Sequence, residues 1–122
     1  MQVPQYILDS LIAEEGNKDY VYTDSQGNLT AGVGHKLVGA ELDQYQDGDK
    51  ILPGDSTQWF ENDASRAYEA ALKQAEALGY GTDNEKFIER LTHTNFQLGE
   101  NWWNEDVNPR ALKKTWAALK SR

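Results

Sequence analysis

The sequence contains no cysteine, only three prolines, and no apolar run of the ~18 residues that a membrane-spanning helix needs. Without cysteine, disulfides and thiolate metal sites are excluded. The first residues lack the basic start and apolar centre of a signal peptide. We therefore expect a protein that is made without a secretion signal and does not insert into a membrane.

Positive charge is also scarce, with 12 Lys and Arg against 20 Asp and Glu and a net charge of -8. Phosphate binding needs clustered Lys and Arg, so nucleic acid is excluded as a partner. The same charge opposes approach to other anionic polymers. At 122 residues, without a repeat, low-complexity tract or linker, the chain is predicted to form a single domain.

The first predicted element is a helix over Pro4–Glu15. Its apolar residues have the spacing of one helical face: Ile7, Leu8, Leu11 and Ile12. At about 100° per residue that stripe centres on Glu15, whereas Glu14 falls toward solvent. An apolar environment disfavours the charged form of a carboxyl group, which suits a general acid near neutral pH. The alternative is a helix-end glutamate whose head reaches water.

A small polar hairpin is predicted next. Residues 20–23 are β-prone, residues 24–28 are typical of a turn, and residues 29–32 form a short return strand. Asp24 lies where the first strand enters the turn, a position at which aspartate commonly caps the turn. We expect too few apolar residues here for a separate core. The glycine pair of Gly32-Val33-Gly34 brings backbone close to backbone before His35, without the features of a nucleotide loop.

Residues 36–54 are predicted to be a loop, with a weak helix around 41–45. Asp55 and Gln58 form a capping-box pattern that opens a long helix, residues 56–78, ending at Gly79. Its inward stripe comprises Trp59, Phe60, Ala67, Ala71 and Ala75, with Leu78 near its end. Asp63 falls on the same stripe and needs a partner, for which His35 is the candidate. Because His35 and His93 lack a metal-ligand spacing such as HExxH, we expect no metal and no cofactor.

Two more helices are predicted. Thr82 with Glu85 opens one that ends at Gly99, with the apolar residues Phe87, Ile88, Leu91 and Phe96. Asn108-Pro109 opens the last, with Leu112, Trp116 and Leu119 on one side. Between them, Trp102 and Trp103 are more readily explained as core residues than as a surface that stacks on sugars.

The segment Glu15–His35 closely resembles the catalytic segment of the T-even phage lysozymes, glycoside hydrolase family 24. The shared pattern is Glu-Gly, then Tyr-x-Asp, then Gly-x-x-Thr-x-Gly-x-Gly-His, with no gap. Residues 55–71 and 96–100 resemble the family's connecting helix and the start of its larger lobe. The resemblance covers about the first hundred residues of the chain.

This resemblance implies an α+β, lysozyme-like fold. A small lobe with a β-hairpin, about residues 15–54, is joined by a long helix to a helical lobe made of residues 1–14 and 55–122. The implied activity is that of a muramidase, which hydrolyses the bond between N-acetylmuramic acid and N-acetylglucosamine in peptidoglycan. Glu15 is then the general acid, Asp24 the second carboxylate, and Thr30 the residue that positions the attacking water. The implied substrate-binding residues are Gly34, Phe96, Gln97 and Arg110.

The C-terminal quarter departs from the family pattern, because only 22 residues follow Glu100. Either the family's last helices are condensed, with Trp103 and Arg110 in place of its tryptophan–arginine motif, or the chain is the front of a longer protein. The resemblance implies a protein found in the host cytoplasm when synthesised or within the virion. The acidity would suit a protein held among other virion proteins, a high-salt setting, or an enzyme that depends less on electrostatic steering toward the wall. Two other functions remain open. One is a non-catalytic peptidoglycan-binding or structural virion module, and the other is a lytic transglycosylase, which needs only the glutamate.

Overall fold

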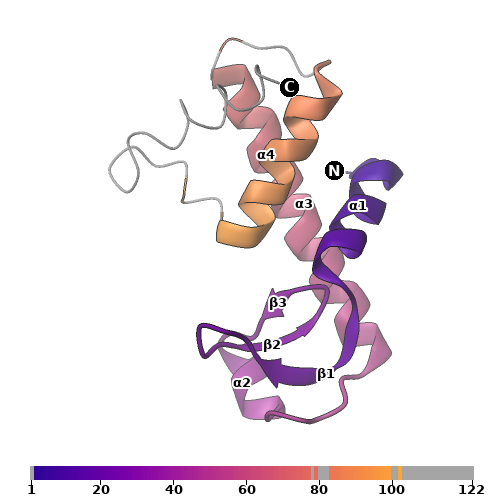
Figure 1. Cartoon of the computed structure of the whole chain (residues 1–122), viewed down its shortest axis with the longest axis vertical. Helices are drawn as coiled ribbons and strands as arrows, with labels where there is room; N and C mark the ends of the chain where they lie inside the picture. Colours follow the sequence, from indigo (N-terminus) through magenta and orange to yellow (C-terminus); the bar gives the residue numbers. More distant parts are fainter. Residues whose placement is uncertain (1, 78, 80–82, 100–101, 103–122) are drawn as a thin grey trace. The chain divides into compact units, whose positions relative to one another are not determined.

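The computed structural model describes residues 2–77, 79, 83–99 and 102. The fold is α+β, as the sequence predicts, with helices and one three-stranded antiparallel sheet (Figure 1). In chain order the elements are α1 (Gln5–Glu15), β1 (Lys18–Thr23), β2 (Leu29–Gly32), β3 (His35–Lys36), α2 (Ala40–Gln44), α3 (Pro53–Ala77) and α4 (Glu85–Leu98). No helix in the described part of the chain is long and apolar enough to cross a membrane.

The chain forms two compact units whose boundary falls inside α3. The sheet unit comprises Gln2–Ala64, and the helical unit runs from Ser65 onward. The sequence-based division instead assigns residues 1–14 and 55–64 to the helical lobe. The start of α3 belongs to the sheet unit because Trp59 packs into the core beneath the strands, and Ser56 lies against Gly32 of β2.

The sheet has the order β1-β2-β3, and its register places Thr30 between Tyr22 on β1 and Lys36 on β3. The outer edge of β1 is covered by residues 48–51, a segment predicted as loop. The Val21 N–H donates to the Asp49 carbonyl over 2.7 Å, and the Ile51 N–H donates to the Asp19 carbonyl over 2.9 Å. These bonds satisfy backbone groups that an open edge strand would leave unpaired.

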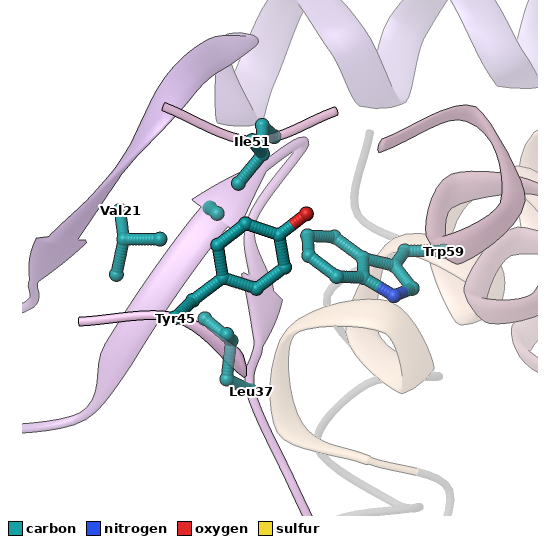
Figure 2. Packing of buried hydrophobic residues seen from close by; sticks show 6 residues of the cluster. Val21, Leu37, Tyr45, Ile51 and Trp59 are labelled. Carbon is teal, nitrogen blue, oxygen red and sulfur yellow. The ribbon is translucent and has the colours of Figure 1, made fainter. Parts of the chain in front are cut away.

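The prediction that the hairpin lacks a core of its own agrees with the structure, because most of the buried residues packed against it come from other segments. One face of the sheet packs on a buried apolar cluster composed of Val21, Ala31, Leu37, Tyr45, Ile51 and Trp59 (Figure 2). The Tyr45 ring meets the Trp59 indole edge-to-face, with ring centroids 5.8 Å apart. Burying one large apolar side chain contributes about 1.5–3 kcal/mol. Residues from outside the strands, such as Tyr45, Ile51 and Trp59, therefore supply much of the stability of the small sheet.

Helix α3 begins at Pro53, before the predicted start at residue 56. Proline is well suited to the first position of a helix, because its missing N–H would have no intrahelical partner there. Asp55 therefore lies in the first turn rather than at the N-cap, and its carboxylate accepts a 2.6 Å hydrogen bond from the Tyr45 hydroxyl. The helix ends at Ala77, and Gly79 has a positive φ of 78°, in agreement with the predicted stop.

In the helical unit, Ala67, Ala71 and Ala75 are buried on α3 as predicted. Helix α4 is capped by Asn84, whose side chain accepts the Phe87 N–H over 3.2 Å. The predicted cap, Thr82, is therefore wrong for this helix, and Thr82 itself lies outside the described residues. Asparagine at this position satisfies one of the unpaired N–H groups of the first turn.

Asn95 joins the elements of the helical unit. Its side-chain amide pairs reciprocally with that of Gln74, at 2.9 and 3.0 Å, and also donates to the Ala67 carbonyl over 3.0 Å. The indole N–H of Trp102 donates to the same Asn95 side chain. Trp102 is buried, which confirms a core role for this tryptophan. Trp103 and the predicted helix after Asn108 lie outside the described residues.

Candidate active site

Glu15 is the last residue of α1 and leads directly toward β1. Gly16 ends the helix with a positive φ of 76°, and its N–H donates to the Ile12 carbonyl over 2.8 Å. The Glu15 side chain is partly buried, whereas Glu14 is exposed. The prediction that Glu15 and not Glu14 faces inward is confirmed, although Ile12 of the predicted stripe is itself exposed.

The carboxyl group of Glu15 lies against the backbone of Gly34. A Cβ atom on Gly34 would be 3.0 Å from Oε2 of Glu15 and 3.5 Å from its Cδ. Gly34 also has a positive φ of 61°, which residues with a Cβ rarely adopt. The glycine turn after β2 thus provides the space in which this carboxyl group sits. Gly34, predicted as a substrate-binding residue, contacts the proposed acid directly.

Thr30 lies at the centre of a row that crosses all three strands, Tyr22–Thr30–Lys36. Directly paired residues project from the same face of a sheet, and successive residues alternate between faces. Because Val21 and Ala31 project into the core cluster, this row lies on the opposite face. Thr30 is only 4% exposed there, and its hydroxyl donates to the Asn28 carbonyl over 3.1 Å.

Asp24 follows β1 and organises the turn into β2. Its Oδ1 accepts the N–H groups of Gln26 and Asn28 over 2.9 and 2.8 Å. The hydrogen bond from the Asn28 backbone is the main reason that the pKa of Asp24 lies below its ordinary value, and the nearby charge of Lys36 acts in the same direction. Asp24 therefore caps the turn, as the simpler interpretation predicts, and those same bonds hold its carboxylate ionised.

Tyr22 is the residue of this site that the sequence interpretation does not single out. Burial raises the pKa of its phenol, Lys18 opposes that shift, and the negative charges of Glu15 and Asp24 raise the pKa further. Both carboxylates are thus close enough to act on one phenol, which is paired with Thr30. Successive strand residues project from opposite faces of the sheet. Because Val21 projects into the core, its neighbour Tyr22 projects from the same face as Thr30.

His35 forms the predicted contact with Asp63 and a second one that was not predicted. Its Nδ1 lies 2.6 Å from Oδ2 of Asp63, and its Nε2 lies 2.8 Å from Oε1 of Glu41. The imidazole also stacks on Trp59, with ring centroids 4.7 Å apart. Burial alone would lower the pKa of His35, but the hydrogen bonds to Asp63 and Glu41 outweigh burial and raise it.

The other predicted substrate-binding residues belong to the helical unit or lie outside the described residues. Phe96 and Gln97 lie near the end of α4 in the helical unit, with Phe96 partly buried and Gln97 exposed. Arg110 lies outside the described residues. Among the residues that the structure describes, no group of three or more His, Asp or Glu side chains is arranged to hold a metal ion.

Comparison with protein-family models gives no match to this chain, and a search of curated proteins gives none either. The function is therefore inferred from the residues and from the geometry of the sheet unit.

Proposed function

We propose that the chain is a glycoside hydrolase that uses two carboxylates, Glu15 and Asp24. The main supporting observation is the placement of three groups around β2: the Glu15 carboxyl group lies against Gly34 after this strand, Asp24 forms the turn before it, and the buried Thr30 lies on the strand itself. An acid, an ionised carboxylate and a hydroxyl within one small unit are the groups that glycosidic hydrolysis requires.

The carboxylates take different roles because their surroundings differ. Asp24 is held ionised by backbone N–H groups, so it stabilises the positive charge that develops on the sugar. Glu15, partly buried against Gly34, is the residue that donates a proton to the leaving oxygen. The two roles cannot be exchanged, because Asp24 is ionised over the whole neutral range.

Thr30 orients the attacking water in this proposal. Its hydroxyl proton is already used in the bond to the Asn28 carbonyl, so the oxygen offers its lone pairs. A water that donates one proton to Thr30 and the other to Asp24 directs its own lone pair at the sugar. Attack by water on the face opposite the leaving group inverts the anomeric carbon, and this geometry needs roughly 6.5–9.5 Å between the two carboxyl groups.

Within this class, we propose that the enzyme is a muramidase of the phage-lysozyme type, an endolysin or a virion-associated lysozyme that acts on the bacterial wall. The resemblance of Glu15–His35 to the T-even phage lysozymes supports this choice, together with a fold in which a helix ends on the acid and a polar hairpin carries the other two groups. The proposed substrate is the β-1,4 bond between N-acetylmuramic acid and N-acetylglucosamine.

The test is digestion of purified peptidoglycan, with reducing ends counted and the fragments analysed by mass spectrometry. A muramidase releases fragments that end in reducing N-acetylmuramic acid and contain one added water. Anhydro-sugar ends would instead identify a lytic transglycosylase. Binding to walls without cleavage would identify a non-catalytic module.

A further inference from the structure

Three side chains of β1 form a cationic aromatic surface beside the proposed site. These residues are Lys18, Tyr20 and Tyr22, and the Lys18 Nζ lies 5.8 Å from the Tyr20 ring centroid and 5.0 Å from that of Tyr22. The two rings meet edge-to-face with centroids 6.2 Å apart. We call these three residues the β1 surface.

The fold itself gains little from this arrangement. The core cluster lies on the opposite face, where Val21 is buried, while Tyr20 is 41% exposed and Lys18 is exposed. An exposed cation–π contact contributes only about 0.5–1 kcal/mol. The exposed Tyr20 ring beside the partly buried Tyr22 ring is therefore better explained by a ligand that stacks on the rings than by stability.

The β1 surface is continuous with the proposed catalytic residues. Tyr22 belongs to the surface and is also paired with Thr30, and the charges of Glu15 and Asp24 act on its phenol. A sugar adjoining the bond to be cleaved would lie next to the two rings. Lys18 supplies a positive charge there, in a chain whose net charge is -8.

We propose that the β1 surface is a binding subsite for an N-acetylhexosamine that carries a carboxylate, such as the lactyl acid of muramic acid. The apolar face of the pyranose ring packs on Tyr20 and Tyr22, and the Lys18 ammonium pairs with the acid. This inference rests on the proposed function, because it adds the recognition of an acidic sugar to that site.

The experiment measures binding to the full chain carrying Glu15→Gln, so that the ligand is not cleaved. Two tetrasaccharides are titrated and followed by backbone and Tyr side-chain NMR. One is composed of alternating N-acetylglucosamine and N-acetylmuramic acid with free lactyl groups, and the other is the neutral N-acetylglucosamine tetramer. We expect Lys18→Met to lower the affinity for the acidic tetrasaccharide about tenfold and to leave the affinity for the neutral one unchanged. Tyr20→Leu should lower the affinity for both about tenfold.

Matched controls are Lys86→Met, which removes the same charge from exposed α4, and Tyr6→Leu, which removes an exposed tyrosine from α1. Neither should change the affinity for either ligand. Equal effects of Lys18→Met and Lys86→Met would overturn the inference, because only the net charge would then matter. If Lys18→Met lowered the affinity for both tetrasaccharides equally, the proposal that Lys18 recognises the acid would also be overturned.

The unmodified chain is assayed on peptidoglycan in parallel. If it hydrolyses walls while the β1 surface shows no response to either tetrasaccharide, the inference fails and the proposed function stands. If the acidic tetrasaccharide binds the β1 surface with the expected Lys18 dependence but walls are not cleaved, the hydrolase proposal fails and the subsite stands.

Discussion

His35 and Asp63 form a 2.6 Å contact that ties β3 to α3 within the sheet unit. Both side chains are largely buried, with exposed fractions of 11% and 15%. A buried histidine or aspartate without a partner would destabilise the fold, whereas each of these two side chains provides the other with a hydrogen-bond partner. Glu41 of α2 holds the second ring nitrogen, so a single imidazole joins three elements.

The first prediction concerns the pH dependence of this contact. Because the folded pKa of His35 is raised above its unfolded value of ~6.5, its contribution to stability is fully present below pH ~6.5. That contribution is lost as the pH rises through the folded pKa. His35→Asn should therefore cost about 2 kcal/mol of unfolding free energy at pH 5.5, and clearly less at pH 9.

Denaturant unfolding across pH 5–9 measures this difference, with Glu41→Gln as a companion variant that removes one charge and keeps the amide oxygen as an acceptor. Glu41→Gln should show the same pH trend with a smaller amplitude. A cost of His35→Asn that is independent of pH would mean that no ion pair contributes to stability.

The second prediction concerns the space around Glu15. In Gly34→Ala the new methyl group would lie 3.0 Å from Oε2 of Glu15, so the carboxyl group must move. A displacement of about 1 Å at a catalytic group can lower the rate roughly a hundredfold. Steady-state hydrolysis of a soluble glycan should show this fall in kcat, along with a small loss of stability from the positive φ.

Gly39→Ala is the matched control, because Gly39 also has a positive φ, 57°, but nothing within 4 Å of its Cβ position. It should lower the melting temperature without a comparable loss of kcat. If both variants lose activity in proportion to their stability, the contact between Gly34 and Glu15 has no catalytic meaning.

The third prediction separates the roles of Asp24 and Thr30. Asp24→Asn removes the charge that stabilises the transition state and should lower kcat by roughly 10²–10⁴-fold. Thr30→Val keeps the shape of threonine without its hydroxyl, and should cost less, about tenfold to a hundredfold, whereas Thr30→Ser should retain most activity. Near-normal activity of Asp24→Asn would refute a mechanism with two carboxylates.

The fourth prediction concerns salt. An enzyme with a net charge of -8 is repelled by an anionic wall, and salt screens this repulsion over ~10 Å at 0.1 M. Activity on whole walls should rise from very low to moderate salt. Glu61→Gln with Glu76→Gln removes two exposed charges from α3, taking the net charge from -8 to -6, and should raise low-salt activity while reducing the gain from salt. A steady fall in activity from very low salt would contradict this view.

Local patterns in the sequence predict much of the fold. Apolar spacing predicts α1 and α3, and glycine positions predict where α1, α3 and α4 end, because these features act within one turn of the chain. The inward direction of Glu15 follows from the same periodicity. Even the contact between His35 and Asp63 is predictable, since each needs a partner and each lies on an inward face.

Contacts that depend on register between distant segments could not be predicted in this way. Nothing local to residues 48–51 indicates that they cover the edge of β1, and Tyr45 and Trp59 complete the sheet core from outside the hairpin. The contact of Glu41 with His35 could not be predicted from the residues around Glu41, because it depends on where α2 lies. Among the site residues, Tyr22 was missed because its role arises from pairing with Thr30.

The central claim is tested most directly by comparing Glu15→Gln with Glu14→Gln in the reducing-end assay on purified peptidoglycan. Both substitutions remove one negative charge from neighbouring positions of α1, but only Glu15 is partly buried against Gly34. Glu15→Gln should abolish hydrolysis while leaving the melting temperature nearly unchanged, because an amide cannot donate the proton. Glu14→Gln should remain as active as the unmodified chain. Equal activity in the two variants, whether retained or lost, would contradict the assignment of Glu15 as the general acid.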